Sequence, residues 1–295
     1  MIRGVFDPPE TLAGAFPPRD ARMHKYSAGS VAVVGGSDAF PNAPALAALG
    51  ARSAGAGMVR IASVDGTRAA AACLVPEATF VPGFPDVAPR LPRVDAAAVG
   101  MGLGSSAERI VRSVLSCGSV NAVLDADALS AIADAERSGR PILPAPGCTA
   151  VLTPHSAEAA KLLGCTSAEI DAGRDAAAEE IRRRFRATVV LKGPGTIVLS
   201  EDGKWQFVSD RGNPFMALGG MGDLLSGAIA ARWARLMRSG MSAAAAAPLA
   251  AAAAVWLHSA AADSLVCADS PVEPSAANTA ARMASMRIAL ERIVS

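Results

Sequence analysis

The chain has almost no net charge, few aromatic side chains and no paired cysteines. Its 28 Lys and Arg residues against 27 Asp and Glu residues leave a formal charge of +1, which excludes a broad basic surface for nucleic acid. The five cysteines form no C-x-x-C pair, so neither a disulfide framework nor a zinc site is expected. Aromatic residues make up only 4% of the chain, so alanine rather than lipid-facing bulk accounts for the mean hydropathy of +0.31. These features indicate a soluble globular protein.

The sequence also shows no targeting signal and no strong membrane span. The first 23 residues lack an apolar stretch and carry four prolines, which argues against a signal peptide and predicts a Pro-rich, loosely attached arm. The run 243–262 is nearly all alanine and is interrupted by Pro248 and His258, so we expect a buried helix there. Residues 24–295 are expected to form one domain, located in the cytoplasm and not bound to a membrane.

Six short apolar runs, separated by alanine-rich segments of helical length, indicate a parallel sheet. Continuous apolar strands of this kind are typical of a sheet that helices cover on both faces. The runs are 30–34, 58–62, 95–99, 121–124, 150–153 and 188–191. Residues 195–200 and 204–208 instead flank a short polar turn, which predicts an antiparallel hairpin at the edge of the sheet. The predicted class is α/β.

Ligands of an open parallel sheet bind at the carboxyl ends of its strands. Five of the predicted strands end there in glycine or in a residue capable of chemistry. The segments concerned are 35–38, 100–104, 125–127, 153–155 and 192–193. We therefore expect the functional site along this edge of the sheet.

The segment 219–227, with the sequence GGMGDLLSG, is the most specific single motif. Its glycines precede an apolar helix, so backbone N–H groups are free to bind an anion at the helix N-terminus. Asp223 follows at the start of that helix, and an acid beside a phosphate site points to proton transfer or to orientation of a nucleophile. The structural alternative is that Asp223 caps the helix and the glycines permit close packing.

Other segments carry weaker signals. The loop 192–196 places one of only four lysines after a strand, which favours contact with phosphate over a simple turn, although its spacing is not that of a P-loop. The glycines of 100–104 do not have the spacing of a dinucleotide-binding loop. Asp125 and Asp127 either order a magnesium-bound water or support a loop. His258 is interpreted as an ordinary core or surface residue, because it lies inside the alanine-rich helix.

Taken together, these motifs resemble the NAD(P)H-hydrate dehydratase family, which belongs to the ribokinase-like group. They follow the family's order over most of the chain. The matching segments are His24-Lys25, 31–37, Asn42-Ala43, 100–104, 125–129, 152–155, Lys192-Gly193 with Thr196, 212–214 and 219–223. The resemblance implies a three-layer ribokinase-like sandwich with a mainly parallel central sheet, helices on both faces and an antiparallel edge hairpin.

The family repairs nicotinamide cofactors whose reduced ring has been hydrated at C6, the compounds NADHX and NADPHX. A nucleotide, ADP in bacterial members and ATP in eukaryotic ones, phosphorylates the C6 hydroxyl, and elimination of phosphate regenerates NADH or NADPH. The resemblance implies that ADP is the favoured donor, with Mg²⁺ as cofactor and no direct metal ligand from the chain.

The family's residue roles carry over by motif position. The resemblance implies that Asp223 takes the proton from the attacking hydroxyl and that the backbone of Gly220, Met221 and Gly222 holds the phosphoryl group in transfer. Contacts with the adenine nucleotide are implied for Lys192, Gly193, Pro194, Gly195, Thr196 and Gly222. Contacts with the hydrated cofactor are implied for Ala43, Gly104, His155 and Asp223. Supporting roles are expected for Asp125, Asp127 and Asn213.

Some positions depart from the family pattern. Met221 stands where threonine is common, and 215–218 reads FMAL where Gly-Met-Ala-Thr is usual. Two other functions therefore stay open: a ribokinase-like kinase of a small alcohol such as a vitamin precursor, and a catalytically silent nucleotide-binding protein. Many members carry an N-terminal epimerase domain, for which the first 23 residues are too few, so a separate NAD(P)HX epimerase is the expected partner. Bacterial members are often tetramers, which predicts a homotetramer.

Overall fold

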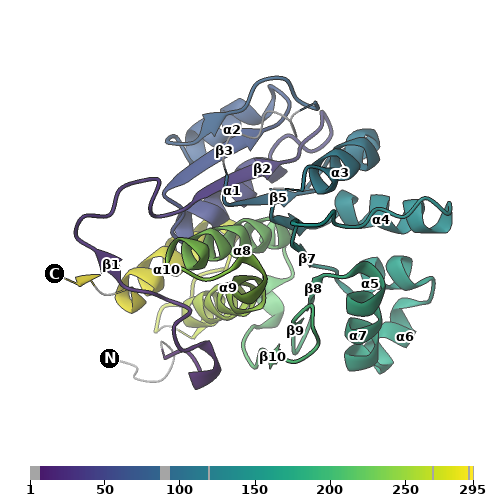
Figure 1. Cartoon of the computed structure of the whole chain (residues 1–295). Coiled ribbons are helices and arrows are strands. Elements are labelled where there is room, and N and C mark those ends of the chain that lie inside the picture. The colour runs from purple at the N-terminus through teal and green to yellow at the C-terminus, as the bar shows by residue number, and fades with distance from the viewer. Residues whose placement is uncertain (1–6, 87–93, 119, 268, 292, 295) are drawn as a thin grey trace.

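The structure, a computed structural model, describes residues 7–86, 94–118, 120–267, 269–291 and 293–294. In this part of the chain nine strands form one sheet, with helices on both faces (Figure 1). The strand order is β10 (Gln206–Val208), β9 (Ile197–Leu199), β8 (Thr188–Leu191), β7 (Ala150–Leu152), β6 (Ala122–Leu124), β5 (Ala96–Val99), β2 (Ser30–Val34), β3 (Met58–Ala62) and β4 (Thr79–Phe80). The strands from β8 to β4 run parallel, whereas β9 is antiparallel to both of its neighbours. The predicted sheet and its edge hairpin are confirmed.

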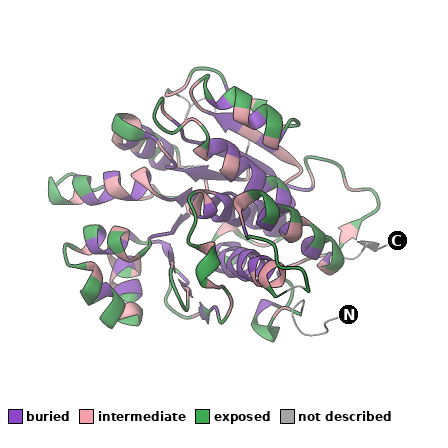
Figure 2. Ribbon diagram, turned by 180° about the vertical axis from the view of Figure 1, so that it is seen from behind, coloured by how far each residue is buried: buried purple, intermediate pink, exposed green. Residues whose placement is uncertain are grey.

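The helices divide into two layers, one on each face of the sheet. The first layer contains α1 (Ala43–Ser53), α2 (Thr67–Leu74), α8 (Met221–Arg238), α9 (Ala243–Val266) and α10 (Ala276–Leu290). The second contains α3 (Ala107–Ser116), α4 (Asp127–Arg137), α5 (Ser156–Leu163), α6 (Ser167–Ala172) and α7 (Arg174–Phe185). Alternate residues of one strand face opposite layers, since Val31 and Val33 pack in the first core and Ala32 and Val34 in the second. Figure 2 shows this buried centre between helices whose outer surfaces are exposed.

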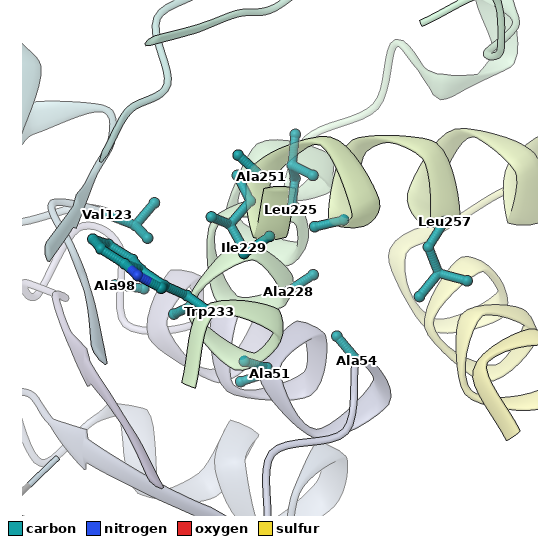
Figure 3. Packing of buried hydrophobic residues seen from close by; sticks show 14 of the residues in the cluster. Ala51, Ala54, Ala98, Val123, Leu225, Ala228, Ile229, Trp233, Ala251 and Leu257 are labelled. Atoms are coloured by element: carbon teal, nitrogen blue, oxygen red, sulfur yellow. The ribbon is translucent and has the colours of Figure 1, made fainter. Parts of the chain in front are cut away.

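Helices α8 and α9 form the centre of the first layer. Trp233 extends from α8 toward Ala98 and Val123 of the sheet (Figure 3), and its side chain is fully buried. Helix α9 is long and apolar enough to cross a membrane, but 72% of its most apolar window is buried inside the protein. It packs against α8 and α10, so the predicted buried helix is what the structure shows.

Residues 10–20 pack onto the domain, whereas the sequence predicts a loosely attached arm. Leu12 is buried, and the backbone carbonyl of Ala15 accepts a hydrogen bond from the buried guanidinium of Arg232. Phe16 meets Trp256 edge to face, with 6.0 Å between the ring centres. Further along, β1 (Arg19–Asp20) pairs in parallel with β11 (Ile293–Val294). Composition alone does not reveal these contacts, because their partners lie at the far end of the chain.

The strand order reverses between β2 and β5. The chain runs outward from β2 through β3 to β4 and then returns to β5 on the other side of β2. The loops that follow β2 and β5 touch: Gly36 N donates to the carbonyl of Met101 at 2.8 Å, and a Cβ on Gly35 would lie 2.5 Å from the same oxygen. Such a reversal opens the crevice in which ligands of open α/β sheets bind.

Two glycines set the distance between α1 and α8. A Cβ on Gly227 would lie 1.8 Å from the carbonyl oxygen of Ala47, and one on Gly50 would lie 1.9 Å from that of Leu224. No side chain fits at either position, so the two helices pack backbone against backbone. This contact holds the N-terminal end of α8 at the carboxyl edge of the sheet.

Replacing Gly227 by alanine is therefore expected to lower the free energy of unfolding by about 2 kcal/mol, the net of overpacking and gained helix propensity. Gly173→Ala is the matched control, because its Cβ would meet nothing closer than Glu169 O at 3.7 Å. Urea unfolding of both variants measures the difference. Equal stabilities would contradict the close contact between the helices.

Candidate active site

At the carboxyl edge of the sheet, residues that follow two different strands form an ion pair. Asp125 follows β6 and is 2% exposed, and Lys192 follows β8. Lys192 Nζ lies 2.7 Å from Asp125 Oδ1 and 3.6 Å from Glu158 Oε2, a residue in the first turn of α5. Burial alone would lower the pKa of Lys192, but the carboxylates of Asp125 and Glu158 outweigh it and raise that pKa, so the ammonium group stays charged.

The first turn of α8 lies against this ion pair. Its N-cap Gly220 has a φ of +89°, a left-handed conformation that glycine adopts without strain. A Cβ on Gly222 would lie 3.7 Å from both Asp125 Oδ2 and Lys192 Nζ. Ser226, one turn further along, hydrogen-bonds to the carboxylate of Asp125 and lies 3.0 Å from Gly222 O. The predicted anion-binding backbone of residues 220–222 is therefore held beside a fixed positive charge. Of its N–H groups, that of Met221 donates a long hydrogen bond of 3.4 Å to Leu218 O.

Asp223 is the titratable group of this turn. Burial raises its pKa to about 7, with a further increase from the negative charge of Asp125 and an opposing decrease from Lys192. A carboxyl group with this pKa exchanges its proton near neutral pH, which is the property that a general base requires. Asp223 does not act purely as a structural helix cap. Gly220 occupies the N-cap position, and Asp223 lies three residues further along. A capping role also would not require the burial that shifts the pKa of Asp223.

A cavity of about 730 Å³ opens next to this turn. It is lined by every residue predicted to contact the nucleotide, Lys192, Gly193, Pro194, Gly195, Thr196 and Gly222. Its other walls are residues 209–214, Met216 and Ala217, together with Met221, Leu225 and one face of α9. The supporting residue Asn213 donates to Asp263 Oδ1 at 2.8 Å, which ties this segment to α9. The volume of the cavity suits a small-molecule ligand.

The residues predicted to contact the hydrated cofactor lie along the same edge and outside the cavity's walls. Ala43 begins α1, whose Leu46 lies against Gly220. Gly104 N donates to Asp127 Oδ2 at 2.8 Å, so Asp127 supports the glycine loop after β5. His155 is exposed and caps α5, accepting hydrogen bonds at Nδ1 from the backbone of that helix. The first turn of α8 thus lies between α1 on one side and the cavity on the other.

Three contributors to this site are not predicted by the sequence. Ser226 is one serine in an apolar helix, and only its spacing of one turn from Gly222 could have suggested a role. Glu158 lies three residues after His155 and outside the motifs recognised in the sequence. His258, interpreted from its helix as an ordinary core or surface residue, is a buried residue that borders the cavity. Within the described residues, no group of three or more His, Cys, Asp or Glu side chains is arranged to hold a metal ion.

The fold and the position of the site define a ribokinase-like protein. A ribokinase-like superfamily protein of Enterococcus faecalis superposes with a TM-score of 0.79 at 23% identity, over 96% of this chain and 94% of that one. The ADP/ATP-dependent NAD(P)H-hydrate dehydratase of Bacillus subtilis, co-crystallised with ATP and Mg²⁺, gives the same TM-score at 28% identity, over 95% of this chain and 96% of that one.

Residues 31–282 match the family model for NAD(P)H-hydrate dehydratase, and the chain belongs to that family. It is 39% identical over 262 residues to the ADP-dependent (S)-NAD(P)H-hydrate dehydratase of Neisseria meningitidis, covering 84% of this chain and 81% of that protein. It is 37% identical over 257 residues, 84% of its length, to the bifunctional NAD(P)H-hydrate repair enzyme of Vibrio cholerae, of which it covers 47%. The chain thus spans about half the length of the bifunctional relatives it matches first.

The raised pKa of Asp223 predicts how the variant Asp223→Asn changes stability. The folded protein holds this proton more tightly than the unfolded chain, so the wild type loses stability as pH rises from the unfolded pKa of 3.8 to the folded value of about 7. Asparagine has no proton to lose. The free energy of unfolding of the variant, relative to that of the wild type, should therefore rise by roughly 2 kcal/mol between about pH 5 and pH 8, after allowing for partial exposure. Urea unfolding at the two pH values tests this, and a constant difference would contradict it.

Proposed function

We propose that this chain catalyses the ADP- or ATP-dependent dehydration of C6-hydrated NADH and NADPH. The observation that carries the proposal is the position of Asp223, with a pKa near 7, in the glycine turn that starts α8. That turn separates a cavity suited to a nucleotide from the edge where the predicted cofactor-binding residues lie. Membership of the dehydratase family supports the same assignment.

The first step would transfer a phosphoryl group to the C6 hydroxyl. Asp223, in its ionised form, takes the hydroxyl proton as that oxygen attacks the terminal phosphorus and the bond to the leaving nucleotide breaks. The N–H groups at residues 220–222 and the ammonium group of Lys192 stabilise the charge on the phosphoryl oxygens. AMP leaves when ADP is the donor, and ADP leaves when ATP is the donor.

The second step would eliminate phosphate. The bond between C6 and the phosphate oxygen breaks with its electron pair, and the departing phosphate or water takes a proton from C5, which restores the ring double bond. The lone pair of the ring nitrogen helps to expel the phosphate, and phosphate is a far better leaving group than hydroxide. The enzyme therefore needs a phosphoryl donor for a reaction that is formally a loss of water.

Magnesium fits this site as a companion of the nucleotide. The two carboxylate oxygens of Asp125 already contact Lys192 and Ser226, so Asp125 and Glu158 would hold Mg²⁺ through water rather than directly. When bound, Mg²⁺ neutralises phosphate charge during the transfer.

The departures from the family pattern leave the cavity open. The side chains of Phe215 and Leu218 are 63% and 39% exposed, and neither belongs to the cavity wall that their neighbours Met216 and Ala217 form. Met221 is buried in that wall, and its substitution changes a side chain and not the backbone donors. This arrangement favours an active enzyme over a silent nucleotide-binding protein.

The direct test mixes the protein with hydrated NADH, Mg²⁺ and either ADP or ATP, and follows the near-ultraviolet absorbance of reduced nicotinamide. We expect recovery with at least one nucleotide, faster with ADP, and a loss of about 100-fold or more in Asp223→Asn, because the base is removed while the shape of the turn is kept. The same change at Asp65, an exposed carboxylate that does not line the cavity, serves as the matched control.

Other outcomes would redirect the assignment. A stable phosphorylated small alcohol without recovery of NADH would favour the kinase. Nucleotide binding with no turnover, unchanged in Asp223→Asn, would favour the silent binder. The homotetramer, the separate NAD(P)HX epimerase and the cytoplasmic location stay predictions of the sequence.

A further inference from the structure

Helix α9 presents a polar pair to the cavity from an otherwise apolar sequence. Most of α9 is alanine, and its residues Val255, His258 and Ser259 line the cavity wall. His258 is 5% exposed and Ser259 is 8% exposed. Burying a polar imidazole costs free energy that burying alanine at the same helix position would not cost. The presence of His258 beside a ligand-sized cavity therefore indicates a functional role.

The imidazole of His258 lacks a partner. Its Nε2 is buried and, among the described residues, has no hydrogen-bond partner. Burial lowers the pKa of His258 to about 4, so the ring is neutral near pH 7 and carries one donor and one acceptor nitrogen. Buried polar groups in native proteins are normally paired. Because Nε2 is closed to solvent, the ring lines the cavity with its other atoms, and Nδ1 is the nitrogen that a ligand there could reach.

The cavity wall combines two kinds of groups. Lys192 and the glycine turn of α8 suit phosphate, whereas Leu225, Val255 and the neutral imidazole of His258 suit a purine or a ribose. The neighbour of His258 on α9 lies close to the segment at Gly212, because a Cβ on Gly212 would lie 3.7 Å from Ser259 Oγ.

We propose that His258 binds the nucleoside half of the phosphoryl donor through an imidazole hydrogen bond, and so is a specificity-determining residue of the nucleotide site. The inference rests on the proposed function, because it takes the cavity to be the nucleotide site. A neutral group with one donor and one acceptor can hydrogen-bond to a base or a ribose hydroxyl. A charged side chain at this position would instead compete with Lys192 for the phosphates.

The experiment compares His258→Leu, which removes both nitrogens at similar size, with His258→Gln, which restores a donor and an acceptor. Isothermal titration calorimetry with Mg²⁺ measures the Kd of ADP, of ATP and of inorganic pyrophosphate. For His258→Leu we expect a Kd for ADP and ATP about tenfold higher or more, and an unchanged Kd for pyrophosphate. His258→Gln should recover part of the loss.

The pyrophosphate measurement separates recognition from damage to the fold. A variant whose structure is disturbed would weaken pyrophosphate and ADP together, and urea unfolding would show a fall in stability. We expect no such fall, because leucine removes an unpaired polar group from a buried position.

The proposal is overturned if the Kd of ADP in His258→Leu stays within about twofold of the wild type, or if pyrophosphate weakens equally. It is also overturned if wild-type protein binds neither ADP nor ATP. Wild-type protein that binds ADP through His258 but restores no reduced nicotinamide would refute the dehydratase and leave this nucleotide contact standing.

Discussion

One buried carboxylate, that of Asp125, connects the three elements on which the site depends. It follows β6, pairs with Lys192 at the end of β8, and hydrogen-bonds to Ser226 in α8. A buried charge is tolerated only when it is paired and hydrogen-bonded, so this network fixes the relative positions of its members. Its negative charge also helps to hold the proton of Asp223 up to neutral pH. The carboxylate of Asp125 therefore determines both the relative positions of these residues and the proton affinity of Asp223.

The architecture was largely predictable because its signals are local. Apolar runs predict β2, β3 and β8 at the residues where they occur, and the polar turn at 201–203 predicts the antiparallel hairpin. The two-residue strands β1, β4 and β11 escape prediction, because so short a segment carries no periodicity. The packing of residues 10–20 escapes it as well, since the contacts of Ala15 and Phe16 with α8 and α9 join distant parts of the chain.

The sequence predicted the position of some residues at this site and not the energetics of the group. The strand-end rule and the glycine motifs place Lys192, Asp125 and Asp223 on one edge, as the structure does. The pKa of Asp223 depends on burial and on a carboxylate from another strand, which no local pattern contains. Likewise, the sequence of its helix predicts that His258 is an ordinary packing residue. Only the three-dimensional structure shows that it lines the cavity. Roles that come from relations between elements are the part that sequence reasoning misses.

Asp125 and burial together hold Asp223 as an acid that titrates near neutral pH. Carbon-13 NMR of the Asp223 side-chain carboxyl, followed against pH in the wild type and in Asp125→Asn, measures this directly. We predict a midpoint close to the folded pKa of about 7 in the wild type, and a lower midpoint in the variant, where Lys192 acts on Asp223 without its partner. A wild-type midpoint near the ordinary value of 3.8, or one that Asp125→Asn does not move, would contradict it.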